Sequence, residues 1–132
     1  MQLAIAYLAT AAFFAVVDTL WLGVVARGFY RAELGDLLAA EVRLGAAVLF
    51  YLVYAAGITI FAVLPAVRAE SLSTALLMGG LFGFFAYATY DLTNLATLRD
   101  WSLRMSVVDM LWGTVLTALG TTVGSTAARL AG

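Results

Sequence analysis

The sequence of 132 residues contains no cysteine, no histidine and no lysine. It therefore has no disulfide, no thiol nucleophile, no histidine ligand for haem and none of the usual zinc ligand sets. Charge is also scarce, because 11% of the residues are charged against about 25% in soluble proteins. The net charge of −1 leaves no basic surface for nucleic acid. We therefore expect no cofactor and no nucleic-acid partner.

Hydrophobic residues make up 64% of the chain, too many for a soluble monomer. All seven basic residues are arginine, which is typical of a GC-rich bacterial genome. The N-terminal run MQLAIAYLATAAFFAVV lacks the positive start of a signal peptide and exceeds its apolar core of about 7–15 residues. We interpret it as a retained membrane span. The composition predicts a multi-pass protein of the bacterial inner membrane, with the lipid bilayer as its first partner.

Four apolar runs are long enough to cross the hydrocarbon core, which takes about 20 residues. They cover residues 3–26, 43–64, 73–97 and 104–127. Only helices or closed barrels satisfy backbone groups in lipid, and these runs lack strand alternation. Residues 1–132 are therefore predicted to form one all-α domain, an integral membrane bundle of four transmembrane helices with up-down connectivity.

The ends of the spans have local signals. Pro65 is expected to end the second helix, because it has no backbone N–H. Ser71 or Ser73 is expected to cap the third helix, and Ser102 the fourth. The first connection, GFYRAELGDLLAAEV, places leucines among acidic residues. This pattern fits a short interfacial helix and, equally, an extension of the second span.

Arginine is distributed unevenly between the two sides of the predicted bundle. Five of the seven lie in connections one and three: Arg27, Arg31, Arg43, Arg99 and Arg104. Only Arg68 and Arg129 lie on the other side. Because positive charge stays on the cytoplasmic side, connections one and three are predicted to be cytoplasmic and both termini outside.

Three aspartates lie inside the predicted spans: Asp18 in the first, Asp91 in the third and Asp109 in the fourth. Up-down connectivity places all three on one side of the bilayer, about 6–9 Å from its centre at about 1.5 Å per residue. An ionised Asp at a helix centre costs about 2.5–3.5 kcal/mol, so such groups pair, hold a proton or line water. Clustered carboxylates also repel one another, so at least one is expected to be protonated.

Each aspartate belongs to a small or polar stripe of helical spacing that is expected to face the bundle interior. The stripe of the fourth span contains Ser102, Ser106, Asp109, Gly113, Thr117, Gly120 and Gly124. That of the third contains Gly80, Gly83, Tyr87, Asp91 and Asn94, and that of the first Tyr7, Ala11, Phe14, Asp18 and then Trp21 or Leu22. The second span offers Arg43, Ala47, Tyr51 and Tyr54.

These stripes allow two interpretations. In one, the aspartates form a functional polar cavity. In the other, each pairs with an arginine and only orients the helices. The candidate charge partners are Arg43, Arg99 and Arg104, and the candidate hydroxyl donors are Tyr51, Tyr54, Tyr87 and Tyr90. The polar groups exceed what simple pairing requires, which favours the cavity.

A short repeat links the first and fourth spans. VVDTLW (16–21) and VVDMLW (107–112) match at five of six positions. The two spans run in opposite directions, so the match does not establish a duplication. It places Trp21 and Trp112 about one turn from an aspartate on the same helix face. Each tryptophan can wall a site, donate its indole N–H to a carboxylate, or lie in an interfacial belt; the belt is favoured for Trp101.

The segments VVDTLWLGVVARGFYRAELGDLLA, YATYDLTNLATLRDW and VVDMLWGTVLTA resemble the bacterial membrane-protein family designated domain of unknown function 2177. The resemblance covers essentially the whole chain, and YDLTNLATL is its most specific part. The family usually has Trp-Pro where this chain has Trp101-Ser102. The resemblance implies a four-span membrane protein without an established activity. The residues that match its signature are Asp18, Trp21, Asp91, Asn94, Asp109 and Trp112.

Two functions fit an acidic site at this level. The first is binding or transport of a small polar or cationic molecule, coupled to protons, with Tyr87, Tyr90 and Trp112 stacking on it. Two protomers would pair as a homodimer, because four spans enclose little volume. The second is a lipid-modifying enzyme of the inner leaflet.

In that enzyme Asp91 and Asp109 would be acid and base, Asn94 and Tyr90 would polarise the substrate, and an arginine would hold a headgroup phosphate. A magnesium site is not indicated, because the dense spacing of aspartates is missing. An assembly partner without chemistry is the last alternative. The residues favour binding or transport.

Overall fold

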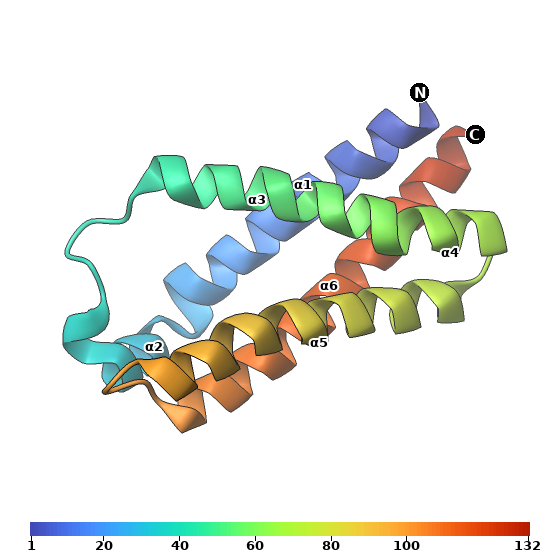
Figure 1. The fold of residues 1–132 in the computed structure, drawn as a ribbon. Helices are drawn as coiled ribbons and strands as arrows, with labels where there is room; N and C mark the ends of the chain where they lie inside the picture. Colours follow the sequence, from blue (N-terminus) through green and yellow to red (C-terminus); the bar gives the residue numbers. More distant parts are fainter.

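A computed structural model describes residues 1–132 as helices joined by short connections. Four helical segments are long and apolar enough to cross a membrane: Gln2–Val25, Leu44–Ala69, Leu72–Thr97 and Leu103–Ala131. They run alternately in opposite directions, and both termini lie at one end of the bundle, here named the terminus end (Figure 1). The predicted four-helix membrane bundle is confirmed.

The first span is α1 (Gln2–Leu20) followed by the π-helical turn η1 (Trp21–Val25). The second consists of α3 (Leu44–Ile58), the π-helical turn η3 (Thr59–Val63) and α4 (Leu64–Ala69). The third and fourth are the uninterrupted helices α5 (Leu72–Thr97) and α6 (Leu103–Ala131). The second and fourth spans run past the predicted ends, to Ala69 and Ala131.

The prediction that Pro65 ends the second helix is wrong. Pro65 lies in the first turn of α4, and the chain stays helical through it. The wider turn η3 comes immediately before, and such local adjustments let a membrane helix accommodate a residue without an N–H. The helix ends at Ala69 instead, and the left-handed backbone of the next residue, Glu70 (φ 49°), turns the chain toward α5.

The first connection forms a separate short helix, α2 (Arg27–Leu34), and a 3₁₀ turn, η2 (Gly35–Leu37). Residues 38–43 then form bends and irregular chain before α3, which excludes an extension of the second span. The helix is formed by RGFYRAEL, whereas Leu37 and Leu38 lie beyond it and are exposed. This connection lies at the end opposite the termini, here named the aspartate end (Figure 1).

Serine side chains cap the last two helices as predicted. Ser71 Oγ accepts a hydrogen bond from the backbone N–H of Thr74 at 3.1 Å, at the start of α5. Ser102 Oγ accepts one from the backbone N–H of Met105 at 3.0 Å, at the start of α6. Both satisfy a backbone donor that the first turn of a helix leaves without a partner.

Helix α6 is central and packs against both α5 and α1. Its predicted stripe is buried from Ser106 through Gly124. A side chain at Gly79 of α5 would lie 2.8 Å from the carbonyl oxygen of Thr117, and one at Gly124 would lie 3.3 Å from the carbonyl oxygen of Ala6 in α1. The small residues therefore serve close helix packing, because they let backbones approach in lipid.

Helix α3 packs on α1 and diverges from α5 toward the aspartate end (Figure 1). The Tyr7 hydroxyl of α1 donates to the carbonyl of Leu52 at 3.0 Å. Phe82 of α5 reaches only the C-terminal part of α3, where its ring stacks on Tyr54 at 5.5 Å. Leu44, Val48, Leu49 and Phe50 stay exposed near the start of α3. This apolar surface is suited to lipid.

Candidate functional site

Asp18 joins three helices. It lies near the end of α1 with 5% of its surface exposed. Its Oδ2 accepts a hydrogen bond from the Tyr51 hydroxyl of α3 at 2.9 Å, and its Oδ1 accepts one from Trp112 Nε1 of α6 at 2.9 Å. Both carboxyl oxygens therefore have a donor, and such charge-assisted bonds are stronger than neutral ones.

Asp109 is held by the short helix α2. Its Oδ1 accepts a hydrogen bond from the Tyr30 hydroxyl at 2.8 Å. The same hydroxyl accepts one from Trp21 Nε1 at 3.2 Å. Burial raises the pKa of Tyr30, which lies outside the spans, so the phenol stays a neutral donor.

The two repeats are connected crosswise. The indole rings of Trp21 and Trp112 stack with centroids 4.2 Å apart and planes 8° apart. Asp18 of the first repeat receives the N–H of Trp112 directly, and Asp109 of the second is linked to Trp21 through Tyr30. Because α1 and α6 are antiparallel, each aspartate meets the tryptophan of the other repeat. The π-helical turn η1 begins at Trp21.

Asp91 differs from the other two aspartates. Its side chain on α5 is completely buried, yet neither carboxyl oxygen has a hydrogen-bond partner. The carboxyl group of Asp109 is the charged neighbour with which it interacts, and Asp109 also interacts electrostatically with Asp18. Asp109 is thus the central member of the cluster. A buried, unpartnered carboxyl group costs free energy, so its presence calls for an explanation.

No arginine pairs with any of the three aspartates, so the prediction of Arg43, Arg99 and Arg104 as their charge partners is wrong. The chain has one salt bridge, between Arg104 and Glu33 at 4.0 Å. Arg43 and Arg99 are exposed and form none. The arginines lie at or beyond the ends of the helices, whereas the aspartates are buried among tyrosine and tryptophan donors.

The other predicted residues lie at different distances from this cluster. Tyr87 is half-buried and packs against Gly113, where any larger residue would collide with its ring. Tyr90 is more than half exposed, and its ring meets Trp101 edge-on at 5.6 Å. Asn94 is half-buried, and its side chain makes no hydrogen bond. Tyr87 therefore belongs to the interior of the cluster, and Tyr90 and Asn94 lie at its edge.

Residues 3–126 match the family described as "Predicted membrane protein (DUF2177)". The chain belongs to this family. The match covers most of each of the four spans and includes all three buried aspartates of this DUF2177 protein, and the description names no activity. No curated protein and no solved structure matches the chain.

Sequence reasoning missed Tyr30 of this DUF2177 chain. The residue lies in the first connection, whereas the hydroxyl donors predicted for the aspartates are all tyrosines of the spans. Tyr30 is buried because α2 folds back on the start of α6, with Ser102 donating to Glu33 at 2.6 Å and Arg104 lying 5.7 Å above the Phe29 ring. The aromatic pair in GFYR was the available signal.

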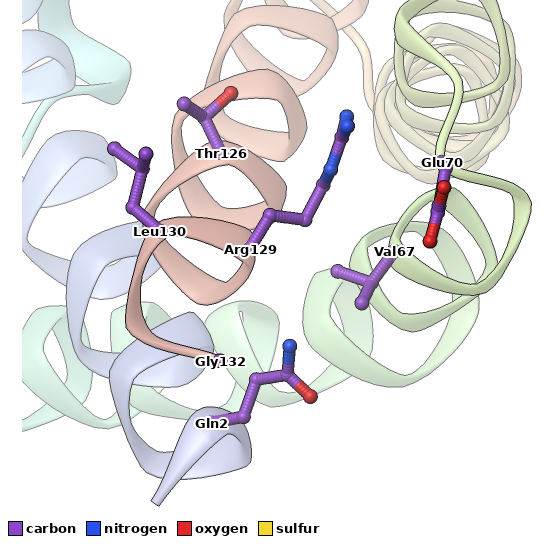
Figure 2. A pocket seen from close by; sticks show the side chains of 7 residues that line it. All are labelled: Gln2, Val67, Glu70, Thr126, Arg129, Leu130 and Gly132. Carbon is purple, nitrogen blue, oxygen red and sulfur yellow. The ribbon is translucent and has the colours of Figure 1, made fainter.

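A hollow of about 670 Å³ lies at the terminus end of the DUF2177 bundle, away from the aspartates. Figure 2 shows Arg129 and Thr126 of α6 on one side and Glu70 and Val67 on the other. Gln2 closes it below, where its amide donates to the carbonyl of Ala128 at 3.0 Å. The hollow and the carboxylate cluster are therefore separate features.

Proposed function

We propose that this protein binds a small polar or cationic molecule at Asp91 and Asp109, inside the membrane, and exchanges it for a proton. The observation that carries the proposal is the completely buried Asp91 carboxyl group, which has no partner beside a second carboxyl group. Ionisable groups at this depth are rare and usually serve ion or substrate pathways.

The missing partner must carry positive charge, and the chain does not supply it. It has no lysine and no histidine, and its arginines lie outside the cluster. Asp18, Asp91 and Asp109 do not converge as a metal-binding group, whereas Mg²⁺ asks for six oxygens in near-octahedral geometry. A proton or an organic cation suits a pair of carboxyl groups, and the nearby Tyr87 ring can contact an organic cation.

Isothermal titration calorimetry of the purified protein in detergent tests this proposal, with benzylammonium and tetraphenylphosphonium as probe cations. Repeating the titration in buffers of different ionisation enthalpy gives the number of protons released. We expect binding of at least one probe with release of about one proton, because the cation replaces the proton at the carboxyl pair. Asp91→Asn is expected to weaken binding at least about tenfold, or about 1.4 kcal/mol.

Asp100→Asn is the matched control, since Asp100 is an exposed aspartate in the third connection. It removes the same charge from the protein and is expected to leave affinity and proton release unchanged. Binding without proton release would contradict the exchange. Equal weakening by Asp91→Asn and Asp100→Asn would show that only net charge matters and would contradict the site.

One observation favours a second candidate function, a lipid-modifying enzyme. Asp109 receives a hydrogen bond from Tyr30 while Asp91 has none, and carboxyl groups in such different environments can act as acid and base. No arginine lies beside them to hold a headgroup phosphate, which makes this candidate the weaker one. Unchanged lipid composition after deletion of the encoding gene would exclude it.

We also propose that the aspartate end faces the cytoplasm of a bacterial inner membrane, because five of the seven arginines lie at that end. The natural chain has no cysteine, so single cysteines report without background from the chain. With a membrane-impermeant maleimide on intact cells, we expect Ala69→Cys at the terminus end to be labelled. Asp36→Cys should be labelled only after permeabilisation. The reverse pattern would overturn this orientation.

A further inference from the structure

We infer that Asp91 and Asp109 share one exchangeable proton, whereas Asp18 stays an ionised structural anion that takes no part in exchange. The inference deepens the proposed function by assigning its proton to named groups. The ligand rests on the proposed function, but the proton does not, because the proton follows from which carboxyl oxygens have a hydrogen-bond donor and which have none.

The donors around Asp18 match its ionised form. The indole N–H of Trp112 can only donate, so Oδ1 must accept. The Tyr51 hydroxyl donates to Oδ2. A proton added to Asp18 would have to share an oxygen with one of these two donors and would weaken the bond to it. The cross-connection of α1, α3 and α6 holds Asp18 as an acceptor.

One oxygen of Asp109 is likewise an acceptor, because two hydrogen bonds in series point toward it. The indole N–H of Trp21 can only donate, so the Tyr30 oxygen accepts from it and the Tyr30 hydrogen is free to point elsewhere. That hydrogen is donated to Oδ1 of Asp109. Oδ2 of Asp109 makes no hydrogen bond, which leaves it open toward a proton.

Asp91 lies one turn after Tyr87 on α5, and Asp109 lies one turn before Gly113 on the antiparallel helix α6. Because Tyr87 packs against Gly113, the open oxygens of Asp91 and Asp109 belong to neighbouring carboxyl groups. No donor of the protein serves any of them. A proton on one carboxyl group can donate to the other, which gives the pair a short, charge-assisted O–H···O bond. Two ionised carboxylates without a donor would repel each other in a medium of low dielectric constant.

Asp91 interacts with Asp109 of α6 and with Tyr90 of its own helix. Asp109 in turn interacts with Tyr30 of α2, Tyr87 of α5 and Asp18 of α1. Both oxygens of Asp18 already accept hydrogen bonds, whereas those of Asp91 accept none. With one proton the pair carries a charge of −1. When a monovalent cation enters and the proton leaves to water, the pair and its ligand again carry −1, so exchange leaves the buried charge unchanged.

Infrared spectroscopy of the full-length protein in lipid nanodiscs, without ligand, tests the inference through the absorption of a protonated carboxyl group. We expect this absorption in the wild type at neutral pH and its loss at high pH. Asp91→Asn should abolish it. Asp109→Asn should shift the pH at which it disappears. Asp18→Asn should keep the absorption and lower the pH at which it disappears, because the variant removes a negative charge that interacts with Asp109. The surface control Asp100→Asn should leave both the absorption and its pH dependence unchanged.

Loss of the absorption in Asp18→Asn, or its survival in Asp91→Asn, would overturn the inference. Carbon-13 labelling of aspartate in the wild type provides a second measurement that needs no variant, because the absorption must shift with the isotope. A wild type that shows this absorption but binds neither probe cation would refute the proposed function and leave the shared proton standing. Binding with proton release in the absence of the absorption would do the opposite.

Discussion

Gly83→Ala is expected to lower the free energy of unfolding by about 2–3 kcal/mol, the upper half of the usual range for overpacking. A methyl group at Gly83 would lie 2.6 Å from Cβ of Thr117 and would also collide with the carbonyl oxygen of Gly113. Backbone atoms cannot turn away as a flexible side chain can. Helices α5 and α6 would have to separate.

Gly80→Ala is the matched control on the same helix. A methyl group there would lie 3.8 Å from Thr114, which is an ordinary contact. Because alanine favours helix over glycine by up to about 1 kcal/mol, this variant should be neutral or slightly stabilised. Unfolding in mixed micelles with increasing sodium dodecyl sulfate, followed by circular dichroism, measures both. Equal stability of the two variants would contradict the close approach of α5 and α6.

Asp18→Ala is expected to lower the free energy of unfolding by about 3–5 kcal/mol, the range for breaking a buried charged interaction. The variant leaves the Tyr51 hydroxyl and the Trp112 indole N–H without an acceptor at positions where water is scarce. Unsatisfied donors are penalised beyond the bond that is lost. The same unfolding titration provides the measurement.

Three comparisons show whether the loss comes from these hydrogen bonds. Asp18→Asn keeps one carbonyl acceptor and should lose roughly half as much, because hydrogen bonds to charged groups contribute about 1.5–3 kcal/mol each. Asp100→Ala, on the exposed third connection, should change stability by less than about 0.5 kcal/mol. In a double-mutant cycle, Tyr51→Phe should cost less in an Asp18→Ala background than in the wild type. Additive effects would contradict the bond.

The spans and the common level of the aspartates could be predicted from the sequence, because the bilayer imposes both. Its thickness fixes the length of an apolar helix, and alternating spans bring Asp18 and Asp109 to the same side. The stripe on α6 was readable for the same reason: small and polar side chains at helical spacing avoid lipid and become buried.

The partners of the aspartates could not be predicted. Opposite charge suggested arginine as the partner. The arginines lie at or beyond the helix ends, however, and the aspartates accept hydrogen bonds from Tyr51, Trp112 and Tyr30 instead. The exchange of partners between the two Asp–Trp repeats depends on how α1 and α6 rotate about their axes, which the hydrophobic pattern leaves open. The course of the chain through Pro65 depended on a π-helical turn, which has no clear sequence signal.

The crosswise connection of the repeats has a consequence for the order of synthesis. The span that is made first carries Asp18, and the span that is made last carries its donor Trp112. Until that last span enters the bilayer, Asp18 lacks one of its two donors, and an aspartate in a membrane helix costs up to about 2.5–3.5 kcal/mol. Asp109, by contrast, arrives when Tyr30 and Trp21 already exist. The first of the four spans therefore has an unsatisfied carboxyl group until the fourth span has been inserted.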